Sequence, residues 1–182
     1  FYQQRIAGAG PYQGANLKRL RDLCPNARTI IDVGMNIAMN TIEYATWAKK
    51  VIAFEPTPQT YQMGIRNIEY AKTQTREHFM KGWYRNSNGW ASMVISGEIE
   101  TYQIGLGPEP KDTNIVIRPD NAGHNYVVNN DRKRWTGKKW IERTDKHHKV
   151  EYEQVPIRIE TLDSYNFEEV DIIKIDVEGF EY

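Results

Sequence analysis

Two apolar runs each end in a residue suited to nucleotide binding. The first, from Ile30 to Ala38, breaks into a turn at Gly34, and the second, from Val51 to Pro56, closes on the carboxylate of Glu55, 21 residues beyond Gly34. A glycine lets the backbone approach a ligand closely, and a helix that begins after it offers free N–H donors. A carboxylate after the second strand can bind the two hydroxyls of a ribose. This pairing predicts a site for a nucleotide-sized ligand.

The elements around these runs alternate between strand and helix. Periodicity and turn residues predict helices over residues 14–24, 40–49 and 58–70, with Asn40 as an N-cap, and strands over 28–33, 51–54, 99–104 and 171–177. Consecutive apolar residues in the early strands suit a parallel sheet that is covered on both faces. We therefore expect an α/β fold with a doubly wound, mostly parallel, Rossmann-like sheet and a ligand site at the carboxyl ends of its strands.

The later segments alternate between apolar and polar residues, as residues 150–159 do, and predict an antiparallel β addition to the fold. Residues 1–27 are expected to form an N-terminal segment with a short helix, and residues 28–182 the main domain. Strands that such a fold adds at its C-terminus are absent after Val177, so Ile173, Ile175 and Val177 should be poorly covered on an edge strand. We expect a fragment of a longer protein, or a chain completed by another copy, that self-associates.

Composition excludes several classes of protein. With 182 residues, 40% hydrophobic and 26% charged, the chain is typical of one globular domain rather than a disordered or fibrous protein. No apolar run reaches the length of a membrane span, so no membrane partner is expected. The single cysteine, Cys24, cannot form an internal disulfide, which favours a reducing, cytoplasmic location.

Six segments occur in the order that is typical of one enzyme family: IDVGMNIAMNTIEYA, VIAFEPTPQTY, QIGLG, NIVIRPDNAG, IETLDSY and VDIIKIDVEGFEY. Together they resemble the FkbM family of S-adenosylmethionine-dependent methyltransferases, whose motifs look like Asp-Val-Gly-x-Asn-x-Gly, Phe-Glu-Pro and Lys-x-Asp-Val-Glu-Gly. The resemblance covers most of residues 29–182. It implies S-adenosyl-L-methionine as the cofactor and O-methylation of a sugar or other small metabolite.

The resemblance also implies roles for particular residues. Those at the methionine end of the cofactor would be Asp32, Gly34 and Asn36, with Thr41 near the start of the following helix. Glu55 would hold the ribose hydroxyls, and Gly105 and Leu106 would border the adenine. Ala38 departs from the family's usual glycine, and its methyl group is expected to lie against the cofactor.

Methyl transfer to a hydroxyl needs positioning and a base. The resemblance places Asp176 beside the reactive sulfonium. Asp176 and His124 are the candidates for the base, with Lys174 as an electrostatic partner, and the sequence does not decide between them. We expect no metal, because no His/Cys cluster has ligand spacing.

A basic stretch at about residues 130–149 interleaves cations with Trp135 and Trp140. It is read first as a solvated insertion, and otherwise as part of an acceptor site for an anionic substrate or for nucleic acid. Two alternatives to a small-molecule methyltransferase therefore stay open. One is a non-catalytic module that keeps the cofactor pocket or only the fold, and the other is a nucleic-acid methyltransferase.

Overall fold

Four parallel strands form the centre of the fold. The computed structural model describes residues 14–73, 95–117, 125–127, 133–135, 140–142 and 153–177. The sheet has the order β10-β1-β2-β3, built from β1 (Thr29–Val33), β2 (Lys50–Phe54), β3 (Glu98–Tyr102) and β10 (Val170–Ile175). All its neighbours pair in parallel. The predicted mostly parallel α/β sheet is confirmed.

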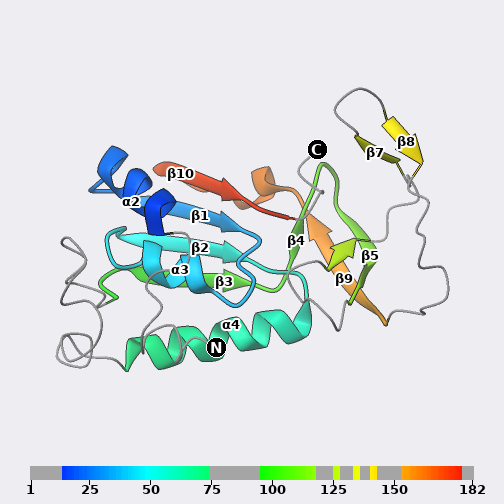
Figure 1. The fold of residues 1–182 in the computed structure, drawn as a ribbon, viewed down its shortest axis with the longest axis horizontal. Helices are drawn as coiled ribbons and strands as arrows, with labels where there is room; N and C mark the ends of the chain where they lie inside the picture. Colours follow the sequence, from blue (N-terminus) through cyan, green and yellow to red (C-terminus); the bar gives the residue numbers. More distant parts are fainter. Residues whose placement is uncertain are drawn as a thin grey trace.

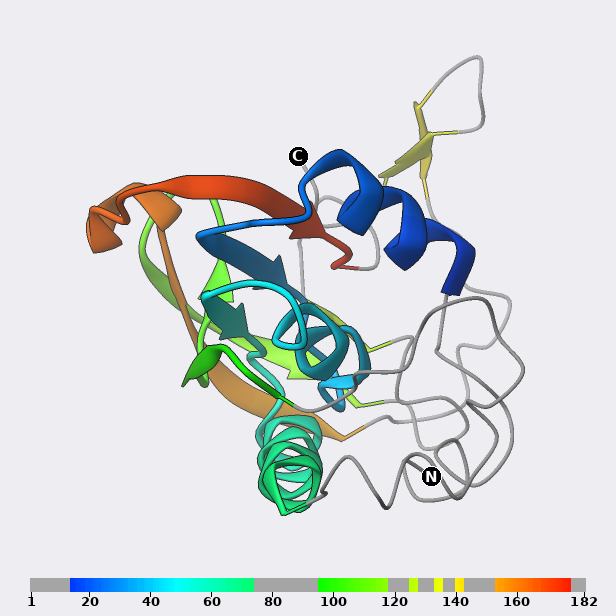
Figure 2. The same ribbon diagram turned by 90° about the vertical axis from the view of Figure 1, so that its left-hand side faces the viewer.

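Helices cover one face of this sheet, and α2 (Gly14–Leu23) and α3 (Met39–Tyr44) lie side by side on it (Figure 2). The long helix α4 (Pro58–Lys72) packs against α3 and begins with Pro58, where a missing N–H costs nothing. On the opposite face, Phe54 packs against Tyr165 and Phe167, which lie in and after a 3₁₀ turn at Leu162–Tyr165. None of the helices in the described part of the chain is long and apolar enough to cross a bilayer.

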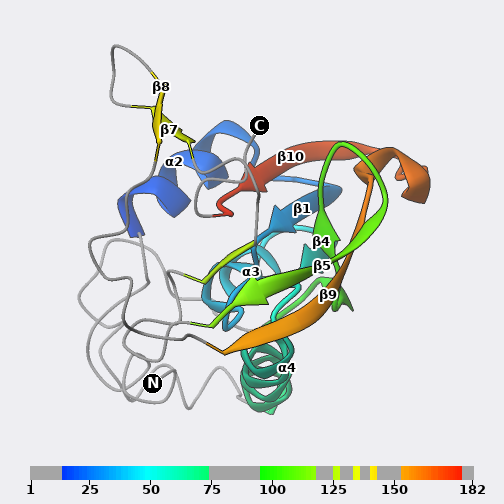
Figure 3. The ribbon, with the colours of Figure 1, turned by 90° about the vertical axis from the view of Figure 1, so that its right-hand side faces the viewer.

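A second sheet stands beyond the carboxyl ends of the parallel strands (Figures 1 and 3). Its order is β4-β9-β5-β6, formed by β4 (Gly105–Leu106), β5 (Lys111–Val116), β6 (Tyr126–Val127) and β9 (Gln154–Glu160). β5 pairs antiparallel with β6 and β9, which confirms the predicted antiparallel addition, while β4 and β9 are parallel. Within the basic stretch, β7 (Lys133–Trp135) and β8 (Trp140–Glu142) form an antiparallel pair.

The helix after β1 differs from the prediction at both ends. It begins at Met39 and ends at Tyr44, and Asn40 lies inside its first turn. The expected N-cap at Asn40 is therefore wrong. The residue before the helix is Ala38, which has φ 66° and makes no side-chain cap. Beyond Tyr44 the chain must turn back toward β2, so the apolar residues Ala45 and Ala48 are buried without continuing the helix.

β10 forms an edge of the parallel sheet as the structure describes it. Ile173 and Ile175 are 47% and 54% exposed, as expected, although they pair in register with the buried Ile31 and Val33 of β1. Val177 differs, because it is partly buried against the cluster around Phe54. An exposed strand edge with apolar side chains is a template for pairing with another chain.

We expect Ile173→Lys to weaken self-association of the chain by about tenfold, because it removes one apolar side chain from the exposed edge. Leu23→Lys is the matched control, since Leu23 is an exposed apolar residue of α2 and not of the edge strand β10. Sedimentation velocity over a concentration series measures the effect. A wild-type protein that stays monomeric at high concentration would contradict the expectation.

Glu43 is a buried acid on α3. It is 3% exposed, and its Oε2 has no hydrogen-bond partner. Burial raises the pKa of Glu43 from 4.5 to about 7, and the positive charge of Arg21 opposes the shift. Between about pH 4.5 and about pH 7, the folded protein therefore keeps Glu43 protonated, whereas the unfolded chain releases the proton.

The free energy of unfolding should accordingly fall as the pH rises from about 4.5 to about 7. Glu43→Gln stays neutral at every pH and should be more stable than wild type by about 3 kcal/mol above about pH 8. The difference should shrink toward about pH 4.5. Urea denaturation at the two pH extremes measures it, with the exposed Glu69→Gln as control. A pH-independent difference would show that Glu43 does not titrate in this way.

Candidate functional site

A cavity of about 520 Å³ opens where the parallel strands end and the second sheet begins. This volume lies within the range of small-molecule and cofactor sites. Its wall on the parallel-sheet side includes Gly34, Asn36 and Glu55, and its wall on the second sheet includes Gly105 and Leu106. The structure therefore brings together residues that the sequence placed in separate motifs.

The turn at Gly34 is fixed by strands on both sides. Its N–H donates to the carbonyl oxygen of Phe54 at 3.0 Å, and the N–H of Met35 donates to the same oxygen at 2.8 Å. Gly34 has φ 80°, and a Cβ there would lie 2.0 Å from the carbonyl oxygen of Asp176. The glycine is thus needed for the close approach of the segment after β10, in addition to any approach of a ligand.

Gly34→Ala should destabilise the protein by about 3 kcal/mol or more, because it combines a left-handed backbone with a clash against backbone. Ala38→Gly is the matched control in the same loop: it relieves the positive φ of Ala38 and should leave stability unchanged or raise it by up to about 1 kcal/mol. Chemical denaturation of both variants measures the difference. Equal stability of the two variants would contradict the role assigned to Gly34.

Asn36 continues the turn with a positive φ of 53°. Its own Oδ1 accepts a hydrogen bond from the N–H of Ile37 at 2.7 Å, and Asn67 of α4 donates to the carbonyl oxygen of Ile37 at 2.8 Å. Asparagine tolerates this conformation because its short polar side chain can bond locally. The loop between β1 and α3 is therefore held by its own side chains and by α4.

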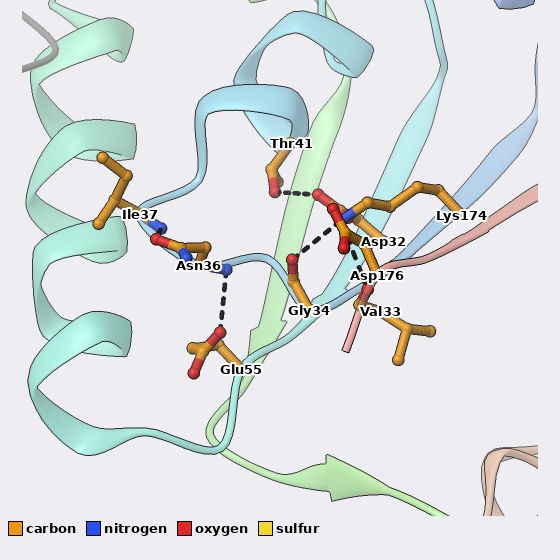
Figure 4. A network of polar contacts seen from close by, with 9 residues as sticks. All are labelled: Asp32, Val33, Gly34, Asn36, Ile37, Thr41, Glu55, Lys174 and Asp176. Carbon is orange, nitrogen blue, oxygen red and sulfur yellow. Dashed lines mark hydrogen bonds and ion pairs between the residues drawn. The ribbon is translucent and has the colours of Figure 1, made fainter. Parts of the chain in front are cut away.

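Glu55 faces the cavity beside this loop (Figure 4). Its Oε2 accepts the N–H of Asn36 at 3.0 Å, and its Oε1 accepts the N–H of Thr57 at 2.9 Å. Burial raises the pKa of Glu55, and the donors at Thr57 and Asn36 oppose the shift. The Thr57 side chain also interacts with this carboxylate, whose two oxygens offer about four lone-pair sites, so acceptor capacity remains beyond the two backbone donors.

Asp32 and Thr41 lie behind the cavity wall rather than on it. The Thr41 hydroxyl donates to Asp32 Oδ2 at 2.6 Å, and Lys174 Nζ lies 3.0 Å from Asp32 Oδ1 (Figure 4). Burial raises the pKa of Asp32, while Lys174 and Thr41 oppose the shift and stabilise the carboxylate. Lys174 Nζ also donates to the carbonyl oxygen of Gly34 at 2.9 Å. These contacts join β1, β10 and the first turn of α3.

Of the three catalytic candidates, Asp176 and Lys174 line the cavity and His124 lies outside the described residues. The Asp176 side chain is about half exposed, and its Oδ2 lies 3.9 Å from Lys174 Nζ. Its backbone N–H donates to the carbonyl oxygen of Val33 at 3.1 Å, which fixes its place at the end of β10. Asp176 is therefore an accessible carboxylate on the cavity wall.

Ala38 is placed elsewhere than expected. It is fully buried in the core with Met35, Met39 and Ile68, and it is not among the residues that line the cavity. The effect of its methyl group is on the backbone of the loop, where an alanine holds a left-handed conformation that glycine adopts without strain.

Much of the second wall could not be predicted from the sequence, and it includes Ile104, Ile115, Val127 and Ile159. Alternating apolar residues predict strands, but they do not indicate which face of a sheet covers a ligand. Asn40 is also an unexpected wall residue, because its position before the helical pattern is typical of a cap. Among the described residues, no three His, Cys, Asp or Glu side chains are grouped to hold a metal ion.

A mostly parallel α/β sheet, with a nucleotide-sized cavity at its carboxyl edge and an acid after its second strand, defines a Rossmann-like class of ligand-binding domain. Comparison with known proteins narrows the class. The family model of the methyltransferase FkbM domain matches residues 32–182. The chain belongs to this family of methyltransferases.

A curated relative is similar over most of the chain. The protein named "Methyltransferase 1" from Beauveria bassiana (strain ARSEF 2860) is 24% identical over 169 residues, which cover 86% of this chain. The chain spans 57% of the length of that relative. No solved structure matches.

Proposed function

We propose that this chain binds S-adenosyl-L-methionine in the described cavity and methylates a hydroxyl group of a sugar or other small metabolite. The observation that carries the proposal is Glu55, a buried carboxylate that lines the cavity beside the Gly34 turn and keeps acceptor capacity beyond its two backbone donors. Two acceptors on one carboxylate match the two neighbouring hydroxyls of a ribose. Membership of a methyltransferase family supports the reaction class.

The adenosine end of the ligand would lie between Glu55 and the second sheet. Gly105 and Leu106 of β4 line the cavity there, and Ile159 of β9, which is fully buried, pairs with Gly105. Apolar walls suit a planar base, because burial of its faces is favourable and needs no hydrogen-bond partner. A β4 residue with a longer polar side chain would lose this advantage.

The reactive end would lie near Asp176. When bound, S-adenosyl-L-methionine supplies an electrophilic methyl group on a sulfonium. The protein would position the acceptor hydroxyl in line with the methyl–sulfur bond, which breaks to leave the thioether as the carbon–oxygen bond forms, and Asp176 would take the hydroxyl proton. Lys174 is a positioning residue in this scheme, because its ammonium is bound to Asp32 and to the carbonyl of Gly34. His124 stays a second candidate for the base.

The acceptor and the location of the protein extend the same proposal. The favoured partner is a small molecule or carbohydrate rather than a membrane or a nucleic acid, because the resemblance to the FkbM family implies such an acceptor. An anionic acceptor would fit if the basic stretch takes part in its binding. The single cysteine supports a reducing compartment such as the cytoplasm.

Titration calorimetry with S-adenosylhomocysteine tests the proposal. We expect wild-type protein to bind it and Glu55→Gln to bind it more weakly by about 1–3 kcal/mol, since the amide cannot accept from all its former donors. Glu100→Gln is the matched control, because Glu100 lies on β3 outside the cavity and forms an ion pair with Lys50 of β2. Absence of heat and of thermal stabilisation in the wild type would reject the proposed function, and equal affinity of Glu55→Gln would reject the ribose contact.

A further inference from the structure

Asn40 is a polar residue on the cavity wall whose side-chain oxygen lacks a hydrogen-bond donor. It lies in the first turn of α3, lines the cavity, and is 7% exposed. Its Oδ1 is buried and has no hydrogen-bond partner. A buried acceptor without a donor costs about 1–3 kcal/mol, so its retention on a ligand-facing wall calls for a partner that arrives with the ligand.

The neighbouring polar side chains on this wall already have partners within the protein. Asn36 Oδ1 accepts from Ile37, Glu55 accepts two backbone N–H groups, and Lys174 Nζ is bound to Asp32 and Gly34. Asn40 differs from them, because nothing in its surroundings donates to its oxygen. The start of α3 therefore holds, beside the cavity, a buried acceptor for which the protein supplies no donor.

The charges near this acceptor indicate what kind of donor fits it. In the described part of the chain, the carboxylates of Glu55 and Asp176 line the cavity and that of Asp32 lies directly behind it. Lys174 is the cationic side chain that lines the cavity among these described residues. Lys174 is itself 3.0 Å from Asp32, so its charge is largely offset. An excess of carboxylates favours a cationic donor over a neutral hydroxyl or an anion.

We propose that Asn40 Oδ1 accepts a hydrogen bond from a primary ammonium group of the ligand, the α-amino group on the methionine portion of S-adenosyl-L-methionine. The inference rests on the proposed function and adds a residue that determines specificity. Asn40 would make the cavity select nucleosides that carry an amino-acid tail. Thr41, the next residue, is bonded to Asp32 and fixes the helical turn that contains Asn40.

Two probes separate this contact from general binding. S-adenosylhomocysteine carries the amino-acid tail, and 5′-methylthioadenosine has the same nucleoside without it. Asn40→Leu removes the acceptor at similar size, and Asn40→Asp keeps the acceptor and adds a negative charge. Asn114→Leu is the control, since Asn114 is exposed on β5 and does not line the cavity.

We expect Asn40→Leu to weaken S-adenosylhomocysteine binding about tenfold and to leave 5′-methylthioadenosine binding unchanged, while Asn40→Asp binds S-adenosylhomocysteine at least as well as wild type. Unchanged S-adenosylhomocysteine affinity in Asn40→Leu would overturn the inference, and so would an equal loss for both probes, which marks a structural role. Weak binding by Asn40→Asp would also overturn it, because the ligand group would then be an acceptor. Failure of wild type to bind either probe would reject the proposed function itself, and the inference with it.

Discussion

The buried ion pair between Asp32 and Lys174 is the interaction on which the site depends. Asp32 is fully buried at the end of β1, and leaving its charge without a partner there would be strongly unfavourable. Lys174 reaches it from β10 and also binds the carbonyl of Gly34, while Thr41 binds it from α3. One ammonium and one carboxylate thus align two strand ends, a turn and a helix start. Asn40 and Asp176, which are proposed to meet the ligand, belong to these elements, and Glu55 follows the end of β2, which is hydrogen-bonded to the turn.

The parts of this arrangement that the sequence could predict are those with a local signature. A β-branched run that ends in Asp-Val-Gly and another that ends in Phe-Glu-Pro indicate buried parallel strands with functional ends. Because parallel strands share a carboxyl edge, Gly34 and Glu55 could be placed together without knowledge of the structure. The alternation in residues 150–159 likewise predicted a strand of the second sheet, and β9 covers Gln154–Glu160.

Other parts depend on contacts between segments that are distant in the sequence. Gly34 is required mainly by the carbonyl of Asp176, more than a hundred residues later, and no local pattern contains that information. The start of α3 follows from three residues with positive φ, Gly34, Asn36 and Ala38. Of these, only the glycine indicates a positive φ by its residue type. The same limit explains why the sequence pattern predicts a cap at Asn40 and does not reveal that Lys174 binds Asp32 and the carbonyl of Gly34.

Glu55 has a structural role as well as the proposed binding role, and this affects how related chains should be compared. Its two oxygens tie the amide of Asn36, which leads into α3, to the amide of Thr57, which leads into α4. A descendant that had lost its ligand altogether would still need an acid here to keep both helix starts in place. A glutamate at this position in a related chain would therefore indicate a conserved architecture before it indicates a conserved reaction. Whether a related chain still binds the ligand is better judged by whether its glutamate carboxylate still borders an open cavity.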